Sequence, residues 1–351
     1  MFPYYRYLPC TMFLLLAPGL LMLPLNVKAA SCKTQSQMTA AERDALVSAA
    51  RAMVGEVQSG DVQALRQSTI PAVAEDFDGI ASSVGTLKPL VQQAAITVDS
   101  LYLLDASTEP QNAARTDFYC GSPVVVFNLT NLPTGKYALT ILHATGVSQP
   151  QQISLILSET AEHRWMLGGF FSRPMIEAGH NGLWYWVTAR DYAQKSMAWD
   201  AWFYYRVAAY CLEPVDFLSS PNLEKLKREV DHVRPGDLPD TKPLMLAAPG
   251  SVFQVTTIDT TVLLGPLDLE VHYIPDTNQA AQLRDPPTAR KQVTELMIAL
   301  LALHPELRDA FHGIWVQADR DSTSMFSLEL PMDQISPAKQ PPAIASSPIS
   351  Q

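Results

Sequence analysis

The segment from Gly179 to Glu229 constrains the fold most, because it concentrates large aromatic side chains at helical spacing. Four of the six tryptophans of the chain lie in it, at positions 184, 186, 199 and 202. A helix that presents several such side chains must pack them against a partner, since each tryptophan buries a large apolar area. A strand-rich half precedes this segment and a shorter mixed half follows it. We therefore predict that the segment forms a core shared by both halves.

Length and charge balance limit the class of protein. A chain of 351 residues exceeds the usual size of one domain, so two domains are expected. Lys and Arg number 25 against 35 Asp and Glu, which gives a formal net charge of −10, and the basic residues form no run. Because phosphate binding needs clustered Lys and Arg, no nucleic-acid partner is expected.

Residues 1–29 are typical of a signal peptide. Arg6 precedes an apolar run from Leu8 to Leu25, and small residues follow at positions 29–31. We therefore predict an exported protein of a bacterial envelope, located in the periplasm or outside the cell. Cleavage here leaves Cys32 at or near the new N-terminus, so a lipid anchor on Cys32 is an alternative to a disulfide. Membrane attachment is expected only through this anchor or through the signal segment.

Three cysteines remain after such a cleavage: Cys32, Cys120 and Cys211. An oxidising compartment permits one disulfide, for which three pairings exist. We favour the pair Cys32 and Cys120, because Cys211 lies inside a helix pattern where it would be packed and inert. The sequence contains no CxxC or HExxH pattern, so neither a metal nor another cofactor is predicted.

Residues 40–175 are predicted to form a domain of helices and antiparallel strands. From Ala41 to Gln58 the apolar residues recur every three or four positions, and Thr39 with Glu42 supplies a capping box. From Ala95 the period changes to two, which predicts strands near 96–104, 123–129, 137–144, 153–157 and 165–171.

The order of these elements, helices first and then a curled antiparallel sheet with a closing hairpin, resembles the cone-shaped fold of the nuclear transport factor and ketosteroid isomerase proteins. The resemblance implies a pocket inside the cone. None of the carboxylates or the tyrosine that the isomerases of that family use is carried over to this chain. The segment from Asn131 to Leu139 is also similar to a turn of prealbumin-like sandwich modules, so a cone and a sandwich both remain open.

The central residues 179–231 are predicted to form an aromatic-rich helical pair. Residues 182–214 resemble a single tetratricopeptide-like helix pair, on the basis of Tyr185, Ala189, Tyr192, Ala201, Tyr205, Ala208 and Pro214. Small residues let two helices approach, and aromatic side chains fill the groove between them. No second copy flanks the pair, which favours a lone pair packed on the sheet over a peptide-binding array.

The remaining chain is predicted to form a Pro- and Gly-rich linker at 232–250, a small β-β-α-β-β domain at 251–335 and a disordered tail at 336–351. Within the small domain, Asp285 caps a helix that has Pro286 at its first position. Together with the N-terminal half, this order of elements predicts an α+β fold class.

Two groups of side chains are candidates for ligand binding. His143 shares an alternating strand face with Tyr137 and Leu139, where it is either a general base inside a cone or a core histidine. His180 and Asn181 precede Trp184 and Trp186, which together form either a platform for a sugar or peptide or part of the helix-pair core.

No catalytic residue is assigned, because the sequence contains no GxSxG elbow or other spaced signature. The sequence therefore favours an exported, non-enzymatic binding or scaffold module whose partner is a protein, a peptide or a small molecule. The alternative is a small-molecule-binding protein or enzyme that uses a cone-shaped pocket within residues 40–175.

Overall fold

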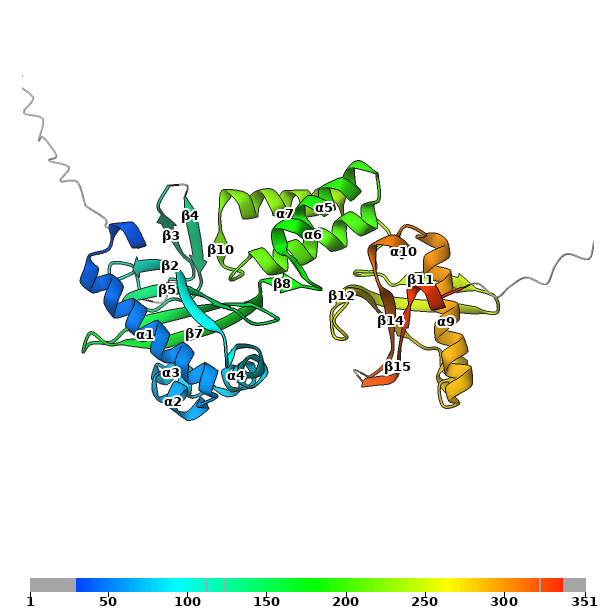
Figure 1. The fold of residues 1–351 in the computed structure, drawn as a ribbon, viewed down its shortest axis with the longest axis horizontal. Coiled ribbons are helices and arrows are strands. Elements are labelled where there is room, and N and C mark those ends of the chain that lie inside the picture. Colours follow the sequence, from blue (N-terminus) through cyan, green and yellow to red (C-terminus); the bar gives the residue numbers. More distant parts are fainter. Residues whose placement is uncertain (1–29, 112, 123, 322, 337–351) are drawn as a thin grey trace, which may run out of the picture.

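The computed structural model describes residues 30–336, except positions 112, 123 and 322. The described chain has an α+β fold with mainly antiparallel sheets, which confirms the predicted fold class. Figure 1 shows an N-terminal lobe (residues 30–175) and a C-terminal lobe (residues 244–335) on either side of a helical layer (residues 176–233). The predicted signal peptide and, apart from Ser336, the predicted tail lie outside the described residues.

Four helices precede the N-terminal sheet: α1 (Ala40–Ser59), α2 (Val62–Gln67), α3 (Pro71–Ala74) and α4 (Asp78–Val91). The predicted capping box is present, since the Thr39 hydroxyl accepts a hydrogen bond from the backbone N–H of Glu42 and the Glu42 carboxylate accepts one from that of Thr39. Gly60 ends α1 in the left-handed conformation, at φ 75°. Among the described helices, none combines the length and the apolar character needed to cross a bilayer.

The N-terminal sheet has five antiparallel strands in the order β1-β2-β5-β6-β7. Their bounds are Ser31–Thr34, Ala95–Asp105, Lys136–Thr145, Gln151–Glu159 and Trp165–Pro174. Register shifts between Val98 and Ser100 and between Ile156 and Leu157 mark bulges, which increase the local twist of a sheet. The sheet remains open, with β1 and β7 as its edge strands.

Each face of this sheet packs against a different layer. Leu142 on β5 and Leu155 on β6 face α1 and α4, in a core with Leu46 and Leu87. The opposite face is covered by a second, three-stranded sheet of order β10-β4-β3, whose strands are Leu218–Ser219, Val125–Leu129 and Thr116–Cys120. The helix-covered interior is therefore filled by apolar side chains.

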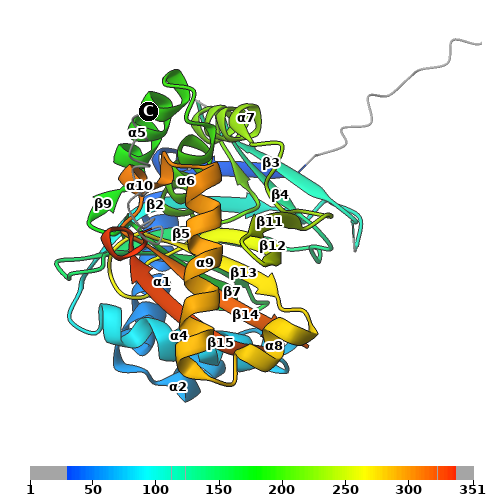
Figure 2. The same cartoon turned by 90° about the vertical axis from the view of Figure 1, so that its right-hand side faces the viewer.

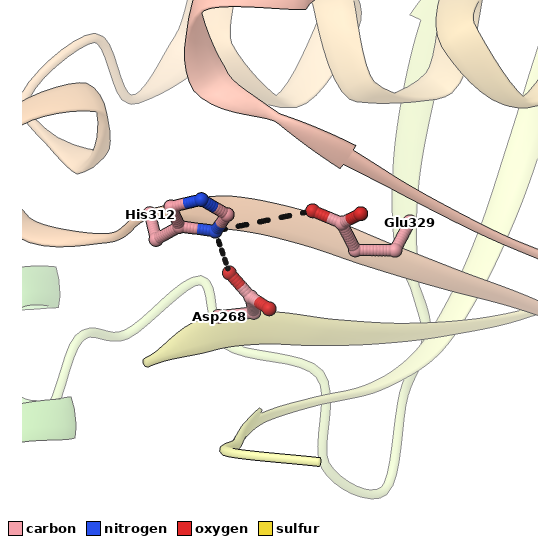
Figure 3. A group of neighbouring side chains, drawn as sticks. All are labelled: Asp268, His312 and Glu329. Carbon is pink, nitrogen blue, oxygen red and sulfur yellow. Dashed lines mark hydrogen bonds and ion pairs between the residues drawn. The ribbon is translucent and has the colours of Figure 1, made fainter. Parts of the chain in front are cut away.

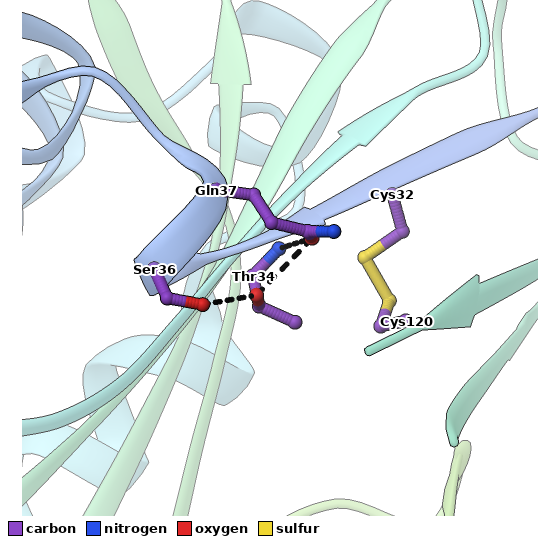
Figure 4. Close-up of a disulfide and its surroundings, with 5 residues drawn as sticks. All are labelled: Cys32, Thr34, Ser36, Gln37 and Cys120. Atoms are coloured by element: carbon purple, nitrogen blue, oxygen red, sulfur yellow. Dashed lines mark hydrogen bonds between the residues drawn. A yellow bond between two sulfur atoms is a disulfide. The ribbon is translucent and has the colours of Figure 1, made fainter. Parts of the chain in front are cut away.

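The predicted disulfide between Cys32 and Cys120 is confirmed. It connects β1, at the edge of the five-stranded sheet, to the end of β3, with the two Cα atoms 5.2 Å apart (Figure 4). Cys211 is the free cysteine of the described residues and is buried, as expected. Burial raises the pKa of its thiol to about 12, so the reactive thiolate is suppressed.

Removal of the disulfide should destabilise the N-terminal lobe. The bond closes a long loop, with a sequence separation of 88 residues, and a disulfide typically contributes about 2 to 4 kcal/mol of stability. We expect a reductant to lower the urea midpoint of the wild-type protein. The Cys211→Ala variant should keep this response to reductant, whereas the Cys32→Ser/Cys120→Ser double variant should lose it. A double variant as stable as the oxidised wild type would show that the bond contributes nothing.

The helical layer contains β8 (Ile176–Glu177), β9 (His180–Asn181), α5 (Gly182–Gln194), α6 (Ala198–Leu212) and α7 (Pro221–Val233). The N-terminus of α5 contacts the C-terminus of α6, because a Cβ at Gly182 would lie 2.6 Å from Leu212 Cγ and 2.9 Å from Cys211 Cβ. The two helices therefore run antiparallel at a separation that only glycine permits at this position.

The C-terminal lobe is a five-stranded sheet of order β11-β12-β13-β14-β15. Its strands are Leu244–Ala248, Ser251–Thr261, Asp268–Ile274, Gly313–Arg320 and Thr323–Pro331. The helices α8 (Thr277–Gln282), α9 (Pro286–Leu303) and α10 (Leu307–Ala310) connect β13 to β14, which pair in parallel. A parallel pair requires such a crossover, and Figure 2 shows α9 lying across one face of the sheet.

The predicted linker and the β-β-α-β-β order need a correction. Residues 244–248 of the predicted linker form the edge strand β11, which pairs with β12 through a tight turn at Gly250. Leu246 of this strand is buried in the core. The Pro and Gly residues on both sides of β11 indicate turns, and these turns delimit a short strand rather than a linker.

The helical layer and the C-terminal lobe share one hydrophobic core. Phe203 and Tyr204 of α6 pack edge-on against Phe311, with ring centroids 5.8 and 5.9 Å apart. The same core contains Leu296 of α9 and Val271 of β13. The aromatic side chains of α5 and α6 thus share a core with the C-terminal lobe alone. The prediction of one core common to both halves needs a correction, because the N-terminal lobe has separate cores and only Val215 and Leu218 of the segment are buried in one of them.

Candidate functional site

A groove separates the N-terminal lobe from the rest of the molecule, and we call it the interlobe groove. Its first hollow has a volume of about 580 Å³. One wall is formed by α4, the β5–β6 turn and β7, through Ser82, Ser83, Thr86, Leu87, Leu90, Ser148, Gln149, Gln151, Ser172 and Pro174. The other wall is formed by the β8–β9 hairpin, α6 and the β12–β13 loop, through Ile176, Glu177, Ala178, Gly179, Tyr210, Val262 and Gly265.

A second hollow of about 410 Å³ shares three lining residues with the first: Glu177, Tyr210 and Val262. It extends along α6 and the C-terminal sheet, where Arg206 forms an ion pair with Asp259 at 3.0 Å. The interlobe groove therefore runs along both lobes, with Glu177 and Tyr210 at the place where its two hollows meet.

The position of Glu177 is fixed by the hairpin that carries it. The Tyr185 hydroxyl on α5 donates a hydrogen bond of 2.9 Å to the backbone carbonyl of Glu177. Ala178 and Gly179 form the turn with φ values of 44° and 82°. A left-handed conformation at a non-glycine residue such as Ala178 is uncommon and is held here by the surrounding contacts. The hairpin is thus attached to the helical layer and presents Glu177 to the groove.

The electrostatics of the first hollow are mild. Eight of its lining side chains carry hydroxyl or amide groups, and among its described lining residues only Glu177 is charged. Burial raises the pKa of the Glu177 carboxyl. The Arg173 guanidinium lies 4.9 Å from the ring centroid of Tyr210 and forms an ion pair with Asp216 at 2.5 Å, so its charge is already compensated. The hollow therefore suits a polar ligand without a strong charge.

The predicted platform residues lie at the start of α5, beside the β8–β9 hairpin. The rings of His180 and Trp184 stack with centroids 3.6 Å apart, and Trp184 is 39% exposed. Asn181 is the N-cap of α5, since its side chain accepts a hydrogen bond from the backbone N–H of Trp184. Asn181 thus has a structural role, while His180 and Trp184 present a partly exposed aromatic pair.

Trp186 does not join this pair. Its indole Nε1 donates a hydrogen bond of 2.7 Å to Glu229 on α7, and the Arg190 guanidinium lies 4.6 Å from its ring centroid. Arg190 also forms an ion pair with Glu229 at 2.8 Å. Trp186 therefore connects α5 to α7. This role agrees with the alternative that the aromatic residues belong to the core of the helices and not to a ligand platform.

His143 does not line either hollow of the interlobe groove and lies on the sheet face opposite α1 and α4. Leu142 and Ala144 point toward the helices, so His143 points away from them. Its Nε2 is 3.3 Å from the Gln152 amide oxygen, and its Nδ1 is 3.9 Å from the Asp99 carboxylate. The helix-covered interior that a cone pocket would use is packed with side chains, and His143 does not face it.

The residues that define the groove could not be recognised from the sequence. Glu177 and Tyr210 lie close to the predicted platform but carry no motif of their own. The pair Ala178 and Gly179 is a weak signal of a sharp turn at this place. It lies at the boundary between two predicted domains, where a glycine indicates a turn. The groove itself brings together positions from 82 to 265, which no local pattern relates.

Comparisons with known proteins give no relative: no family model, no curated protein and no solved structure matches the chain.

Proposed function

We propose that this protein is an exported, non-enzymatic binding module that holds a polar, uncharged oligomer, such as an oligosaccharide or a peptide, in the interlobe groove. The observation that carries the proposal is the groove itself, whose first hollow is lined by hydroxyl and amide side chains of the N-terminal lobe and, on the opposite wall, by Glu177 and Tyr210. Ligand sites commonly lie between domains and combine apolar walls with a few polar groups that fix orientation.

The size and chemistry of the groove support this class of ligand. The two hollows, of about 580 and 410 Å³, lie within the range of about 300 to 1,000 Å³ that is usual for ligand sites. Hydroxyl and amide groups both donate and accept hydrogen bonds, which suits the hydroxyls of a sugar or the backbone of a peptide. Leu87, Leu90 and Ile176 provide apolar contact area beside them.

Export is part of the proposal and has separate support. A disulfide between Cys32 and Cys120 is typical of proteins that fold in an oxidising compartment. The apolar run from Leu8 to Leu25 after Arg6, typical of a signal peptide, agrees with this. The alternative, an enzyme that uses a cone pocket and His143, has less support because His143 lies away from the helix-covered interior.

A groove-filling substitution tests the proposal. Ser83 is an exposed residue of α4 that lines the groove, so Ser83→Trp should obstruct it without disturbing the core. We expect an oligosaccharide or an unstructured peptide from a mixed panel to bind the wild-type protein in calorimetric titrations. The Ser83→Trp variant should bind it at least about tenfold more weakly, which corresponds to about 1.4 kcal/mol.

The matched control is Ser48→Trp, which places the same side chain at an exposed helical serine of α1 that does not line the groove. It should bind as the wild type does. Equal binding by all three proteins would place the ligand elsewhere. Conversion of the ligand into a product by the wild-type protein would contradict the non-enzymatic part of the proposal.

A further inference from the structure

Three strand ends of the C-terminal sheet bring a histidine and two carboxylates together. Asp268 is the first residue of β13, His312 precedes β14, and Glu329 lies near the end of β15. Because β13 and β14 are parallel and β15 is antiparallel to them, these positions lie at the same end of the sheet. Figure 3 shows the two carboxylates directed toward the same side of the His312 ring.

The separations of the side chains match those of ligands around one small cation. His312 Nδ1 is 2.9 Å from Asp268 Oδ1 and 3.9 Å from Glu329 Oε1. One potential ligand atom from each residue lies within 4.8 Å of the other two. Bonds of about 2.0 to 2.1 Å in a tetrahedral zinc site place neighbouring ligand atoms about 3.3 Å apart, between the two observed His312 distances.

Burial gives a second, independent observation. The Asp268 side chain is fully buried, and its Oδ2 atom has no hydrogen-bond partner among the described residues. Glu329 Oε1, which faces His312, is also buried and has no hydrogen bond there. An unsatisfied buried carboxylate is costly, and two of them close together add like-charge repulsion. One histidine that is 46% exposed compensates both poorly.

The backbone at Gly313 is shaped to admit both carboxylates. A Cβ at this position would lie 2.6 Å from Glu329 Oε1, 2.7 Å from the Leu330 carbonyl oxygen and 3.1 Å from Asp268 Oδ1. Any other residue at position 313 would therefore clash with the Glu329 carboxylate and with the backbone of β15. The backbone N–H of His312 donates to the Leu267 carbonyl, and the His312 carbonyl accepts from the N–H of Met332, so the histidine is held on both sides.

We propose that Asp268, His312 and Glu329 form a binding site for one divalent first-row transition metal ion, with Zn²⁺ as the best match. An imidazole nitrogen with two carboxylate oxygens is a common donor set for such ions, whereas Mg²⁺ and Ca²⁺ prefer oxygen alone. The exposed side of His312 leaves room for a water molecule as a fourth ligand. This site does not depend on the interlobe groove.

The sequence predicts no metal because it contains no CxxC or HExxH pattern, whereas the three residues of this site lie far apart along the chain. Asp268 alternates with Leu267 and Leu269 and therefore looks like a residue on an exposed strand face. It is buried because the segments that carry His312 and Glu329 close this end of the sheet. The parallel pairing of β13 with β14 places the aspartate and the histidine side by side although they are 44 residues apart.

Titration of the chelator-treated full protein with Zn²⁺ tests the site. We expect one equivalent to bind and to raise the melting temperature, and a Co²⁺ complex to show the visible absorption of a four- or five-coordinate ion. His312→Ala and Glu329→Gln should each weaken Zn²⁺ binding by more than about tenfold, since each removes a direct ligand and even outer-shell changes cost about 10- to 100-fold.

The control is His272→Ala. His272 also lies between two carboxylates of the same sheet, at 2.6 Å from Asp319 and 3.4 Å from Glu270, but the three do not converge on one point. This variant should keep the stoichiometric binding. The proposal is wrong if no equivalent binds to the wild type, or if His312→Ala and Glu329→Gln bind as tightly as the wild type does. Asp268→Asn is a less direct test, because a buried substitution can also impair folding.

Discussion

Substitution of Trp199 by alanine should cost about 3 to 5 kcal/mol of stability, the usual range for a large aromatic side chain in a core. Trp199 is 3% exposed and stacks on His304, with ring centroids 4.0 Å apart. Its indole Nε1 also donates a hydrogen bond of 3.0 Å to Asp237. Trp199→Ala would therefore leave a cavity where α6 meets the C-terminal lobe. Urea unfolding of the purified variant measures the loss.

Trp202→Ala is the matched control, because Trp202 is three residues along the same helix but only half-buried. Its ring lies between the core and the surface, 4.9 Å from the buried Phe203 ring and 4.8 Å from the Arg206 guanidinium. We expect it to cost about 1 kcal/mol, as is common for partly exposed side chains. Equal losses for the two variants, or no loss for Trp199→Ala, would contradict the shared core.

Asp200→Asn should change the free energy of unfolding by a pH-dependent amount. Its effect should be about 4 kcal/mol more stabilising at pH 8 than at pH 4. Asp200 of α6 is fully buried, and neither of its carboxylate oxygens has a hydrogen-bond partner among the described residues. Burial, followed by the nearby charges of Glu306 and Asp309, raises its pKa from 3.8 to about 7. Each pKa unit corresponds to about 1.36 kcal/mol.

The sign of this effect follows from proton binding. Between about pH 4 and pH 7 the folded protein keeps the Asp200 proton while the unfolded chain loses it, so the stability falls as the pH rises through this range. Above about pH 7 this loss of stability is complete, and below about pH 4 there is no such loss. Asparagine does not titrate and removes this component. Unfolding free energies of variant and wild type across this pH range measure the difference.

The exposed Asp231 of α7 provides the control for Asp200. Asp231→Asn should change stability by less than about 0.5 kcal/mol, and equally at both pH values, as expected of a surface position. If the difference between Asp200→Asn and wild type does not vary with pH, then Asp200 is ionised in the folded protein and has a partner. Such a result would contradict the finding that the buried Asp200 carboxylate has no hydrogen-bond partner among the described residues.

Local elements were predictable from the sequence where one short segment carries the whole signal. The Thr39 and Glu42 capping box begins α1, and Asp285 with Pro286 begins α9, because a cap needs only residues three positions apart. The disulfide was predictable because helical periodicity excluded Cys211 and left one favoured pair.

Features that depend on long-range packing were not predictable. Strand β11 was missed because its pairing with β12 is invisible in a segment rich in Pro and Gly. The interlobe groove joins residues from Ser82 to Gly265, and the carboxylate pair of Asp268 and Glu329 forms only after three strands align. In each case the chemistry arises from tertiary contacts that have no counterpart in sequence spacing.

Tertiary contacts also decide which residues of the predicted ligand platform are accessible. His180 and Trp184 stack and remain accessible, whereas Trp186 is engaged with α7. Consecutive aromatic residues on a helix point in different directions, and the tertiary partners of each decide whether it is accessible. The sequence could locate the aromatic cluster but could not assign its members to core or surface.

Hydrogen–deuterium exchange with a bound oligosaccharide or peptide tests the central claim, that the interlobe groove is the ligand site. We predict that a ligand selected by calorimetry slows exchange in α4, in the β5–β6 turn and in the β8–β9 hairpin, all of which line the groove. These segments belong to both walls, so protection of both at once indicates a ligand between them. Protection confined to the strand face around His143, with unchanged exchange at α4 and the β8–β9 hairpin, would contradict the account.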